Sequence, residues 1–400
     1  MVSFKKRLLN ELCEINIGKT PLRANSLYWG TGRNWLSIAD LKRKYVSFTK
    51  EQITELAIEK CNMKIIPKNT VVMSFKLSLG KLAIVQDDIY SNEAIASFPI
   101  KNKDELLPEY LYYALKTVDL KKYADKAAKG ITLNKKKLNM IQIPYTDIDT
   151  QKKVVEILNS AEILIQNRQA QIIALDELIQ SIFYKTFGDL FKNPYEFKKV
   201  QLDFLLKEPP QNGMYKPSTD YCETEGTPIL RIDSFYKGKI TKLDELKRIK
   251  STELEIKKYR LNINDIVINR VNSIEYLGKC GLVETLNEDT VFESNMMKLR
   301  INDELVNPKY LTHVLSSAFI HNQILKKAKH SVNQSSINQT DVKSFEIILP
   351  PINLQNEYAS KIIEIEKHKS VFVESLKDFN YFYHACLAKS FKSESFKEYV

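Results

Sequence analysis

The sequence lacks any apolar run long enough to cross a bilayer, and it is poor in cysteine and glycine. No stretch approaches the roughly eighteen consecutive apolar residues of a transmembrane helix, so we exclude a membrane-spanning helix and expect no membrane partner. The five cysteines lie far apart without a CxxC pair, which argues against a disulfide framework and a zinc site. The first residues carry no secretory apolar stretch. We therefore expect a reduced, cytoplasmic protein.

Catalytic motifs are also scarce. Residues 18–20 (Gly-Lys-Thr) resemble the end of a phosphate-binding loop. However, Cys13 stands where that loop needs glycine, and Pro21 interrupts the helix that should follow. His313 and His321 could share one helix face, but no histidine pair has metal-ligand spacing, so a structural or solvated role is expected. We predict no catalytic residue, no metal and no cofactor in this chain.

Positive charge is distributed unevenly along the chain. The net charge of +11 favours a polyanionic partner without identifying it. Residues 1–150 hold 25 Lys and Arg against 16 Asp and Glu, and residues 191–350 hold 24 against 21. Residues 151–190 and 351–400 carry net charges of −1 and 0. The excess is confined to two blocks, and each block is followed by a neutral segment.

The two neutral segments carry the same apolar ladder. Successive positions are separated by alternating steps of four and three residues, which is typical of a coiled-coil seam. Every position of the second ladder lies 204 residues after one of the first, so we predict two long helices packed on each other. Asp149 and Asn353 stand at equivalent places as candidate N-caps. The seams include Val154, Leu158, Ile165, Ile172 and Ile179 in the first helix, and Tyr358, Ile365, Phe372 and Phe379 in the second.

The blocks before the helices repeat each other loosely. Residues 69–73 and 264–268 both resemble buried strands, and Pro108 and Pro308 both begin a predicted helix. Each block is therefore predicted to be mixed α/β (α+β), and the chain is predicted to be a tandem duplication. The predicted domains are residues 1–150, the long helix 151–190, residues 191–350 and the long helix 351–400.

Basic residues cluster at equivalent places in the two blocks. Residues 121–137 hold seven lysines and one acid around a predicted turn at 130–132, and residues 326–330 are followed by small hydroxyl and amide residues. Such side chains suit phosphate contacts, and their recurrence favours nucleic acid over two solvated helix ends. The predicted phosphate contacts are Lys129, Thr132, Lys135, Lys136, Lys137, Lys329, His330, Asn333, Gln334 and Ser336.

A second group of side chains is predicted to read bases. Arg, Lys, Asn and Gln make the hydrogen bonds that distinguish base edges in the major groove. We therefore look for these residues on loops and beside the central strands of each block. The candidates are Lys19, Arg23, Arg33, Lys76, Lys216, Arg270 and Asn272.

Several segments resemble the specificity subunit of type I restriction-modification systems. Residues 18–21 (Gly-Lys-Thr-Pro), followed by residues 35–40 (Trp-Leu-Ser-Ile-Ala-Asp), are similar to the opening of one class of target-recognition domain. Residues 212–215 (Asn-Gly-Met-Tyr) are similar to the opening of another class. The resemblance covers essentially the whole chain, because the order and spacing of the segments also agree.

The ends of the two blocks add to this resemblance. Residues 141–144 and 347–351 are similar to the family's junctions into its long helices, and residues 175–189 resemble the end of the central helix. One departure is Tyr145, which stands where the first junction would have a second proline. This departure weakens that one boundary only.

The resemblance implies two domains that each read one half of a split target in double-stranded DNA. It also implies an antiparallel helix pair that docks two methyltransferase subunits, with restriction subunits joining the complex. The chain would be non-catalytic, and S-adenosylmethionine, ATP and Mg would be bound by the partners. A helix of about forty residues spans about 60 Å, which exceeds one duplex turn of roughly 34–36 Å. The alternatives are a stand-alone nuclease or methyltransferase, and a coiled-coil protein that does not act on DNA.

Replacing Lys135, Lys136 and Lys137 together should weaken binding to all DNA sequences alike and flatten its salt dependence. The reason is that phosphate contacts carry no sequence information but release counterions. Affinities for specific and unrelated duplexes, measured over a range of salt concentrations, check this. A loss of specificity with unchanged affinity for unrelated DNA would contradict it.

Overall fold

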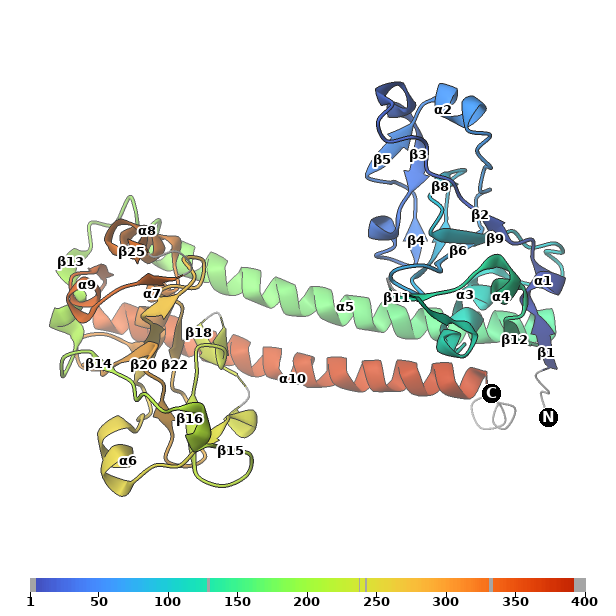
Figure 1. The fold of residues 1–400 in the computed structure, drawn as a ribbon. Helices are drawn as coiled ribbons and strands as arrows, with labels where there is room; N and C mark the ends of the chain where they lie inside the picture. Colours follow the sequence, from blue (N-terminus) through green and yellow to red (C-terminus); the bar gives the residue numbers. More distant parts are fainter. Residues whose placement is uncertain (1–4, 128–129, 237, 242, 331–333, 392–400) are drawn as a thin grey trace. The chain divides into compact units, whose positions relative to one another are not determined.

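The protein is described by a computed structural model over residues 5–127, 130–236, 238–241, 243–330 and 334–391. It divides into two units, the first comprising Met1–Ala170 with Phe372–Val400 and the second Gln171–Val371. Two long helices, α5 (Ile148–Phe187) and α10 (Ile352–Ser390), contribute to both units (Figure 1). Within the described ranges, none of the helices has the apolar length that a bilayer requires.

The first unit is built around a five-stranded sheet. Its central strand β6 (Val71–Ser74) is fully buried and antiparallel to β9 (Ile95–Phe98) and β7 (Leu82–Val85). β2 (Asn16–Ile17) extends the sheet beside β9, and β4 (Tyr45–Val46) runs parallel to β7. Helix α3 (Pro108–Lys116) begins at the predicted proline and packs against β6 and β7.

Smaller elements surround this sheet. Their bounds are β1 Lys5–Leu8, α1 Leu9–Leu12, η1 Ser26–Tyr28, β3 Trp29–Leu36, η2 Ile38–Asp40, β5 Glu51–Ile53, α2 Glu55–Lys60, β8 Tyr90–Ser91, η3 Leu120–Tyr123, β10 Asp125–Ala127, β11 Gly130–Thr132, α4 Lys135–Asn139 and β12 Gln142–Tyr145. Strands β5, β3 and β8 form a second sheet in that order. β1 pairs with β12, and β10 forms a hairpin with β11.

The second unit repeats this plan with a longer sheet. The buried strand β20 (Ile266–Asn269) lies between β24 (Met296–Leu299) and β22 (Cys280–Leu282), antiparallel to both. β18 (Gly238–Ile240) runs parallel to β22, as β4 does to β7. Helix α7 (Pro308–Leu315) packs against β22. The mixed α/β architecture predicted for both blocks is therefore confirmed.

The remaining elements of the second unit complete the large sheet and form three further sheets. Their bounds are β13 Lys198–Gln201, η4 Leu202–Leu205, β14 Gln211–Asn212, η5 Ser218–Asp220, β15 Tyr221–Cys222, β16 Thr227–Leu230, β17 Phe235–Tyr236, η6 Leu243–Glu245, β19 Arg248–Ile249, α6 Glu253–Tyr259, β21 Val271–Asn272, β23 Val291–Phe292, α8 Ala318–Lys327, β25 Lys329–His330, β26 Ser335–Ser336, α9 Gln339–Lys343 and β27 Glu346–Leu349. The large sheet has the order β14-β24-β20-β22-β18-β17. The others are β15-β19-β16-β23, β21-β26-β25 and β13-β27.

Within each unit, segments of α5 and α10 pack antiparallel. In the first unit the guanidinium of Arg168 lies 4.3 Å from the ring centre of Phe372, and the Tyr383 hydroxyl donates to Glu162 at 3.2 Å. In the second unit, Lys369 of α10 forms an ion pair with Asp176 of α5. Every position of both predicted ladders is buried or half-buried. The two cations in the seams thus have partners on the opposite helix.

Each unit completes its hydrophobic core with side chains from both helices. In the first unit, Val154 and Leu158 of α5 and Tyr383 of α10 join the core beneath the central sheet. In the second unit, Phe187 of α5 and Tyr358 of α10 take the corresponding place. All five are nearly or fully buried, and a buried side chain of this size contributes about 1.5–3 kcal/mol.

A buried glutamine ties each block to the first turn of its helix. Gln151 and Gln355 lie 204 positions apart, and both are fully buried. The Gln151 side-chain oxygen accepts from the amide of Leu107 at 3.0 Å, and that of Gln355 accepts from the amide of Asn307 at 2.9 Å. Each glutamine also donates to the carbonyl five residues before it, at 2.8 Å in both units.

A carboxylate further along α5 joins the helix to the first block. Glu162 accepts from the Tyr113 hydroxyl at 2.8 Å and lies 3.5 Å from the amine of Lys44 and 3.3 Å from that of Lys116. Burial is the main reason why the pKa of Lys44 lies below its usual value. The carboxylate therefore compensates two cations that are partly removed from water.

The same device recurs in the second unit. Glu366 lies 204 positions after Glu162 and contacts the amines of Lys239 at 2.8 Å and Lys309 at 2.6 Å. Burial opposes ionisation of Glu366, but the hydrogen bonds from the two lysines outweigh it and lower its pKa. The duplication thus extends to a carboxylate on each long helix that contacts two lysines of its block.

Three local predictions are wrong. Asp149 and Asn353 are not N-caps, because α5 begins at Ile148 and α10 at Ile352. Asp147 fulfils this role in α5, since its carboxylate accepts from the amide of Thr150 at 2.9 Å. The turn predicted at residues 130–132 is strand β11. His313 and His321 do not share a helix face, because a break at residues 316–317 separates α7 from α8.

The second unit should lose stability in acid through His313. Its imidazole stacks on Phe183 at 4.1 Å, bonds the Tyr358 hydroxyl at 2.7 Å, and burial lowers its pKa to about 4. The unfolded chain binds a proton below about pH 6.5, so the free energy of unfolding should fall by about 3 kcal/mol between pH 6.5 and 4. Calorimetric melting over this range measures it. His313→Gln should reduce the change of unfolding free energy with pH, whereas His321→Gln should leave it as in the wild type. The same pH dependence in the wild type and both variants would show that His313 is not its cause.

Candidate nucleic-acid interface

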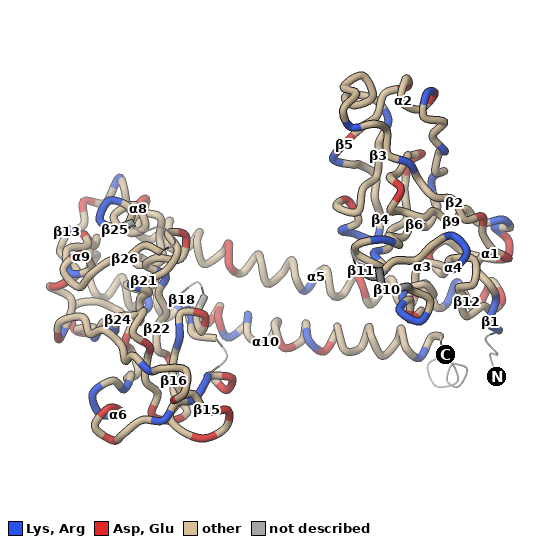
Figure 2. Tube along the Cα trace, viewed as in Figure 1, with Lys and Arg blue, Asp and Glu red and all other residues tan. Residues whose placement is uncertain are grey.

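In the first unit, the β10–β11 hairpin is held at the end of the central strand. The amide of Leu133, just after β11, donates to the carbonyl of Phe75, just after β6, at 2.9 Å. This bond brings Thr132 beside Lys76, and both are half-buried. Figure 2 shows Lys and Arg along the chain near α4 and β10. Lys129 lies outside the described residues.

The second unit holds an equivalent hairpin in the same way. The amide of Ile337, just after β26, donates to the carbonyl of Arg270, just after β20, at 3.0 Å. Strand β26 then pairs with β21 on one side and β25 on the other, so Asn272 lies opposite Ser335 and Lys329 lies opposite Ser336. Candidates that lie about sixty residues apart in sequence therefore share one small sheet.

The remaining candidates of this sheet and of the loop in its hairpin are His330, Asn333, Gln334 and Arg270. The backbone of His330 belongs to β25, but its side chain is not described, and Asn333 lies outside the described residues. Gln334 is exposed. Arg270 donates from Nη1 to the carbonyl of Ser294 at 3.0 Å, and its buried Nε has no partner in the described part of the chain.

Helix α4 is short and begins with three lysines. Lys135, Lys136 and Lys137 form the first turn, which has no acidic residue. The positive end of the helix dipole disfavours cations there. In the second unit, α9 has Asp341 at the position equivalent to Lys137, and Asp341 completes a capping box with Asn338. The first turn of α4 is therefore basic where that of α9 carries an acid.

The candidates near the start of the chain gather on one lobe but are already engaged. Arg23 forms a bidentate pair with Glu51 and lies 3.9 Å from the ring centre of Trp29. Arg33 pairs with Glu55 at 2.9 Å, and the Lys19 amine donates to the carbonyls of Cys61 and Asn62, just after α2, at 3.2 and 3.3 Å. Arg23 and Arg33 remain more than half exposed, so exchange of these partners for a base or phosphate stays a prediction.

Lys216 has a clear structural role. Its side chain is 13% exposed, and its amine lies 2.9 Å from Glu255 and 3.7 Å from Asp220. The hydrogen bond to Glu255 raises the pKa of Lys216. Glu255 also completes the capping box of α6, so Lys216 fastens the loop after β14 to this helix. The predicted base contact from Lys216 would require this anchor to open.

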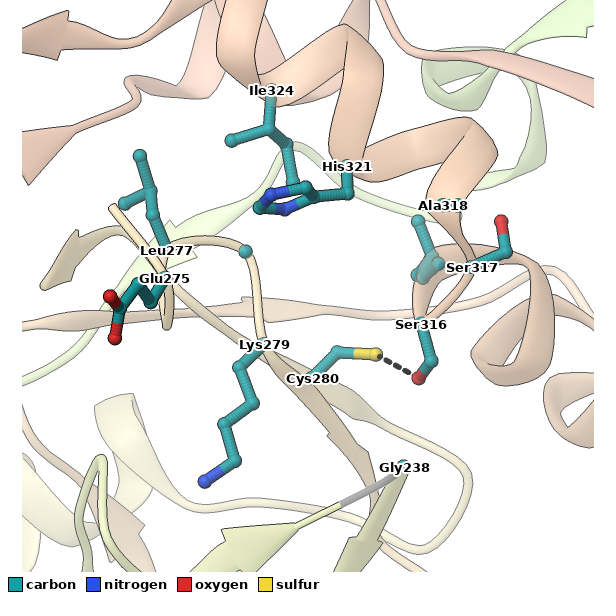
Figure 3. Close-up of a pocket in the computed structure, with 12 residues that line it drawn as sticks. Gly238, Glu275, Leu277, Lys279, Cys280, Ser316, Ser317, Ala318, His321 and Ile324 are labelled. Carbon is teal, nitrogen blue, oxygen red and sulfur yellow. Dashed lines mark hydrogen bonds between the residues drawn. The ribbon is translucent and has the colours of Figure 1, made fainter. Parts of the chain in front are cut away.

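The second unit contains a cleft of about 380 Å³ that could suggest an active site (Figure 3). It lies between the start of α8 and the loop before β22. The Lys279 side chain extends away from the His321 ring, so their polar groups do not converge. Burial raises the pKa of the Cys280 thiol to about 11, and Sγ lies 3.2 Å from the Ser316 hydroxyl. A thiol of this kind is a poor nucleophile.

Metal ligands show no clustering in the described ranges. There, no group of three or more His, Cys, Asp or Glu side chains could hold an ion. The sequence prediction missed another cleft, which is basic and whose lining includes Arg260, Lys298 and Arg300. Its sequence signals were the period-two spacing of Lys298 and Arg300 and the basic residues at 257–260, but nothing local joins these two segments.

A family model described as the type I restriction modification DNA specificity domain matches residues 1–175 and again residues 194–374. The chain belongs to this family. Each match covers one block and extends into the long helix that follows it. The resemblance and the duplication inferred from sequence are both confirmed.

Known specificity subunits are similar over most of the chain. The MjaIX specificity subunit of Methanocaldococcus jannaschii is 25% identical over 384 residues, covering 88% of this chain and 84% of that protein. The EcoKI specificity subunit of Escherichia coli is 22% identical over 274 residues, covering 64% of this chain and 58% of that protein. An S subunit structure from M. genitalium aligns with a TM-score of 0.59 at 14% identity, covering 98% and 97% of the two chains. This last likeness supports the fold alone.

Changing Lys137 to Asp should stabilise the first unit while weakening its DNA binding. The substitution places an acid at the α4 position equivalent to Asp341 of α9. An N-terminal acid in place of a cation should raise the free energy of unfolding by about 0.5–1 kcal/mol. Denaturation followed by tryptophan emission reports on this unit, because Trp29 and Trp35 are the protein's two tryptophans. Lys137→Ala is the control for charge removal; no gain from Asp over Ala would contradict this account.

Proposed function

We propose that this member of the specificity family is the DNA-recognition subunit of a type I restriction-modification complex. In this proposal each block reads one half of a split target in double-stranded DNA. The observation that carries it is the duplicated specificity domain, with a hairpin held at the end of the central strand in each copy. The two half-targets should differ, because the two blocks differ in sequence.

The hairpins and the segments beside them supply the proposed phosphate contacts. Lysines lie in or beside them in both units, including exposed Lys135 and Lys329. Such contacts position a protein on the duplex, whereas specificity requires base edges or DNA shape. The side chains next to the hairpins, Arg270 and Asn272 in the second unit and Lys76 in the first, are the proposed base readers nearest to them.

The long helices are the proposed docking sites for two methyltransferase subunits, joined by restriction subunits. Both helices expose large apolar side chains away from the seam, which favours a protein partner over water. These are Ile163, Leu164, Ile173, Leu178 and Tyr184 on α5, and Ile363, Val371, Val373, Tyr381 and Phe382 on α10. We propose that the partners bind S-adenosylmethionine, ATP and Mg, that this chain is non-catalytic, and that the complex acts in the cytoplasm.

Exchanging residues 1–150 for the corresponding block of another specificity subunit should change one half of the methylated target. The physical reason is that each block would contact its own half-site, while α5 and α10 keep their partners. Mapping methylated sites after co-purification with the methyltransferase measures this. A chain carrying a silent junction at residue 150 is the control.

Two results would reject the proposal. One is a change in both halves of the target after exchange of a single block. The other is cleavage or methylation of DNA by the isolated chain, since this would make the chain itself an enzyme.

A further inference from the structure

The second unit has a strongly basic cleft that none of the predicted contacts includes. It encloses about 560 Å³ beside β14, α6 and β24. Five of its lining residues are cations, and Glu208 is the single acidic residue among those that line it. The cations are Lys257, Lys258, Arg260, Lys298 and Arg300.

Lys298 is the most unusual member of this cleft. It lies on β24, between β14 and β20 of the large sheet, and is only 4% exposed. Its amine lies 3.5 Å from the carbonyl of Arg260, 3.9 Å from the carboxylate of Glu208 and 6.0 Å from the ring centre of Phe292. Both distances to oxygen exceed those of a strong charged hydrogen bond, so this buried ammonium is poorly compensated. Burial accordingly lowers the pKa of Lys298.

Arg300 points one edge of its guanidinium group into the same cleft, and its bonds to Asp265 hold the group in place. Its Nε and Nη2 each donate to Asp265 at 3.1 Å, and Asp265 is 2% exposed. The hydrogen bond to Asp265 raises the pKa of Arg300 and orients the guanidinium. The remaining nitrogen, Nη1, lies 3.3 Å from Glu208. One edge of this guanidinium therefore serves the fold and the other faces the cleft.

A single oxygen of Glu208 lies between these two cations. Oε1 is 3.9 Å from the Lys298 amine and 3.3 Å from Arg300 Nη1. The Glu208 side chain is 43% exposed, so moving it into water costs little. Its carboxylate oxygen occupies the place that an oxygen of an anionic ligand would take. A phosphate group could approach both cations and has more acceptor oxygens than the carboxylate.

We propose that this cleft binds a phosphate group, which displaces the Glu208 side chain from between Lys298 and Arg300. The source we infer is the backbone of duplex DNA, and this part rests on the function proposed above. Gln339 also lines the cleft, and it follows Ser336 of the hairpin by three residues. The cleft thus continues the proposed phosphate surface. The cleft gathers five cations in residues 191–350, the block with the smaller net positive charge.

The first arm of the test uses an unrelated DNA duplex and the full-length chain. Lys298→Met should lower affinity about tenfold, because it removes one charge-assisted contact. The slope of log affinity against log salt should become shallower by about 0.9, as expected for one lost phosphate. Glu208→Gln should do the reverse and tighten binding, since the competing carboxylate is gone. Lys192→Met, which removes an exposed lysine elsewhere in the same unit, should leave the affinity unchanged.

The second arm uses inorganic phosphate and thermal unfolding. Phosphate should raise the melting temperature of the wild type and of Glu208→Gln, but not that of Lys298→Met. Loss of this shift in Lys298→Met with normal DNA binding would support a phosphate site but overturn the DNA backbone as its source. Unchanged behaviour of Lys298→Met and Glu208→Gln in both arms would overturn the cleft as a phosphate site. Wild-type chain that responds to phosphate but binds no DNA would instead refute the proposed function and leave the cleft supported.

Discussion

Neither block of this protein completes its hydrophobic core alone, and this constraint determines the rest of the structure. Each unit needs apolar side chains from both long helices, such as Leu158 with Tyr383 in the first and Phe187 with Tyr358 in the second. Packing of the helices and folding of the block are therefore coupled within each unit. The surfaces proposed to bind DNA and protein depend on this shared core.

Positive charge has two distinct uses in the molecule. Lysines that meet Glu162 or Glu366 are partly buried, and their carboxylate partners specify how each sheet lies on its helix. Lysines at the first turn of α4 follow the β10–β11 hairpin in the sequence, where their charge suits a polyanionic partner. The net charge of +11 combines both uses, so its value says less than the position of each cation.

Features that depend on local pattern were predictable from the sequence. The ladders, the central strands at 71–74 and 266–269, and the helices that start at Pro108 and Pro308 all follow from spacing or from proline. Features made by distant residues were not. Nothing near Lys216 in the sequence indicates its bond to Glu255, and nothing near Lys298 indicates Glu208. For this reason the candidate contacts were a mixture of anchored and accessible side chains.

The repeated carboxylates have a consequence for how such genes can evolve. A recombination event that imports a new first block joins it to a helix that already carries Glu162, and to Tyr383 from the far end of the chain. An incoming sequence without cations where Lys44 and Lys116 stand would leave the half-buried Glu162 with fewer partners, such as the Tyr383 hydroxyl. A new first block thus has to match the charge of α5 as well as complete the hydrophobic core that it shares with both helices.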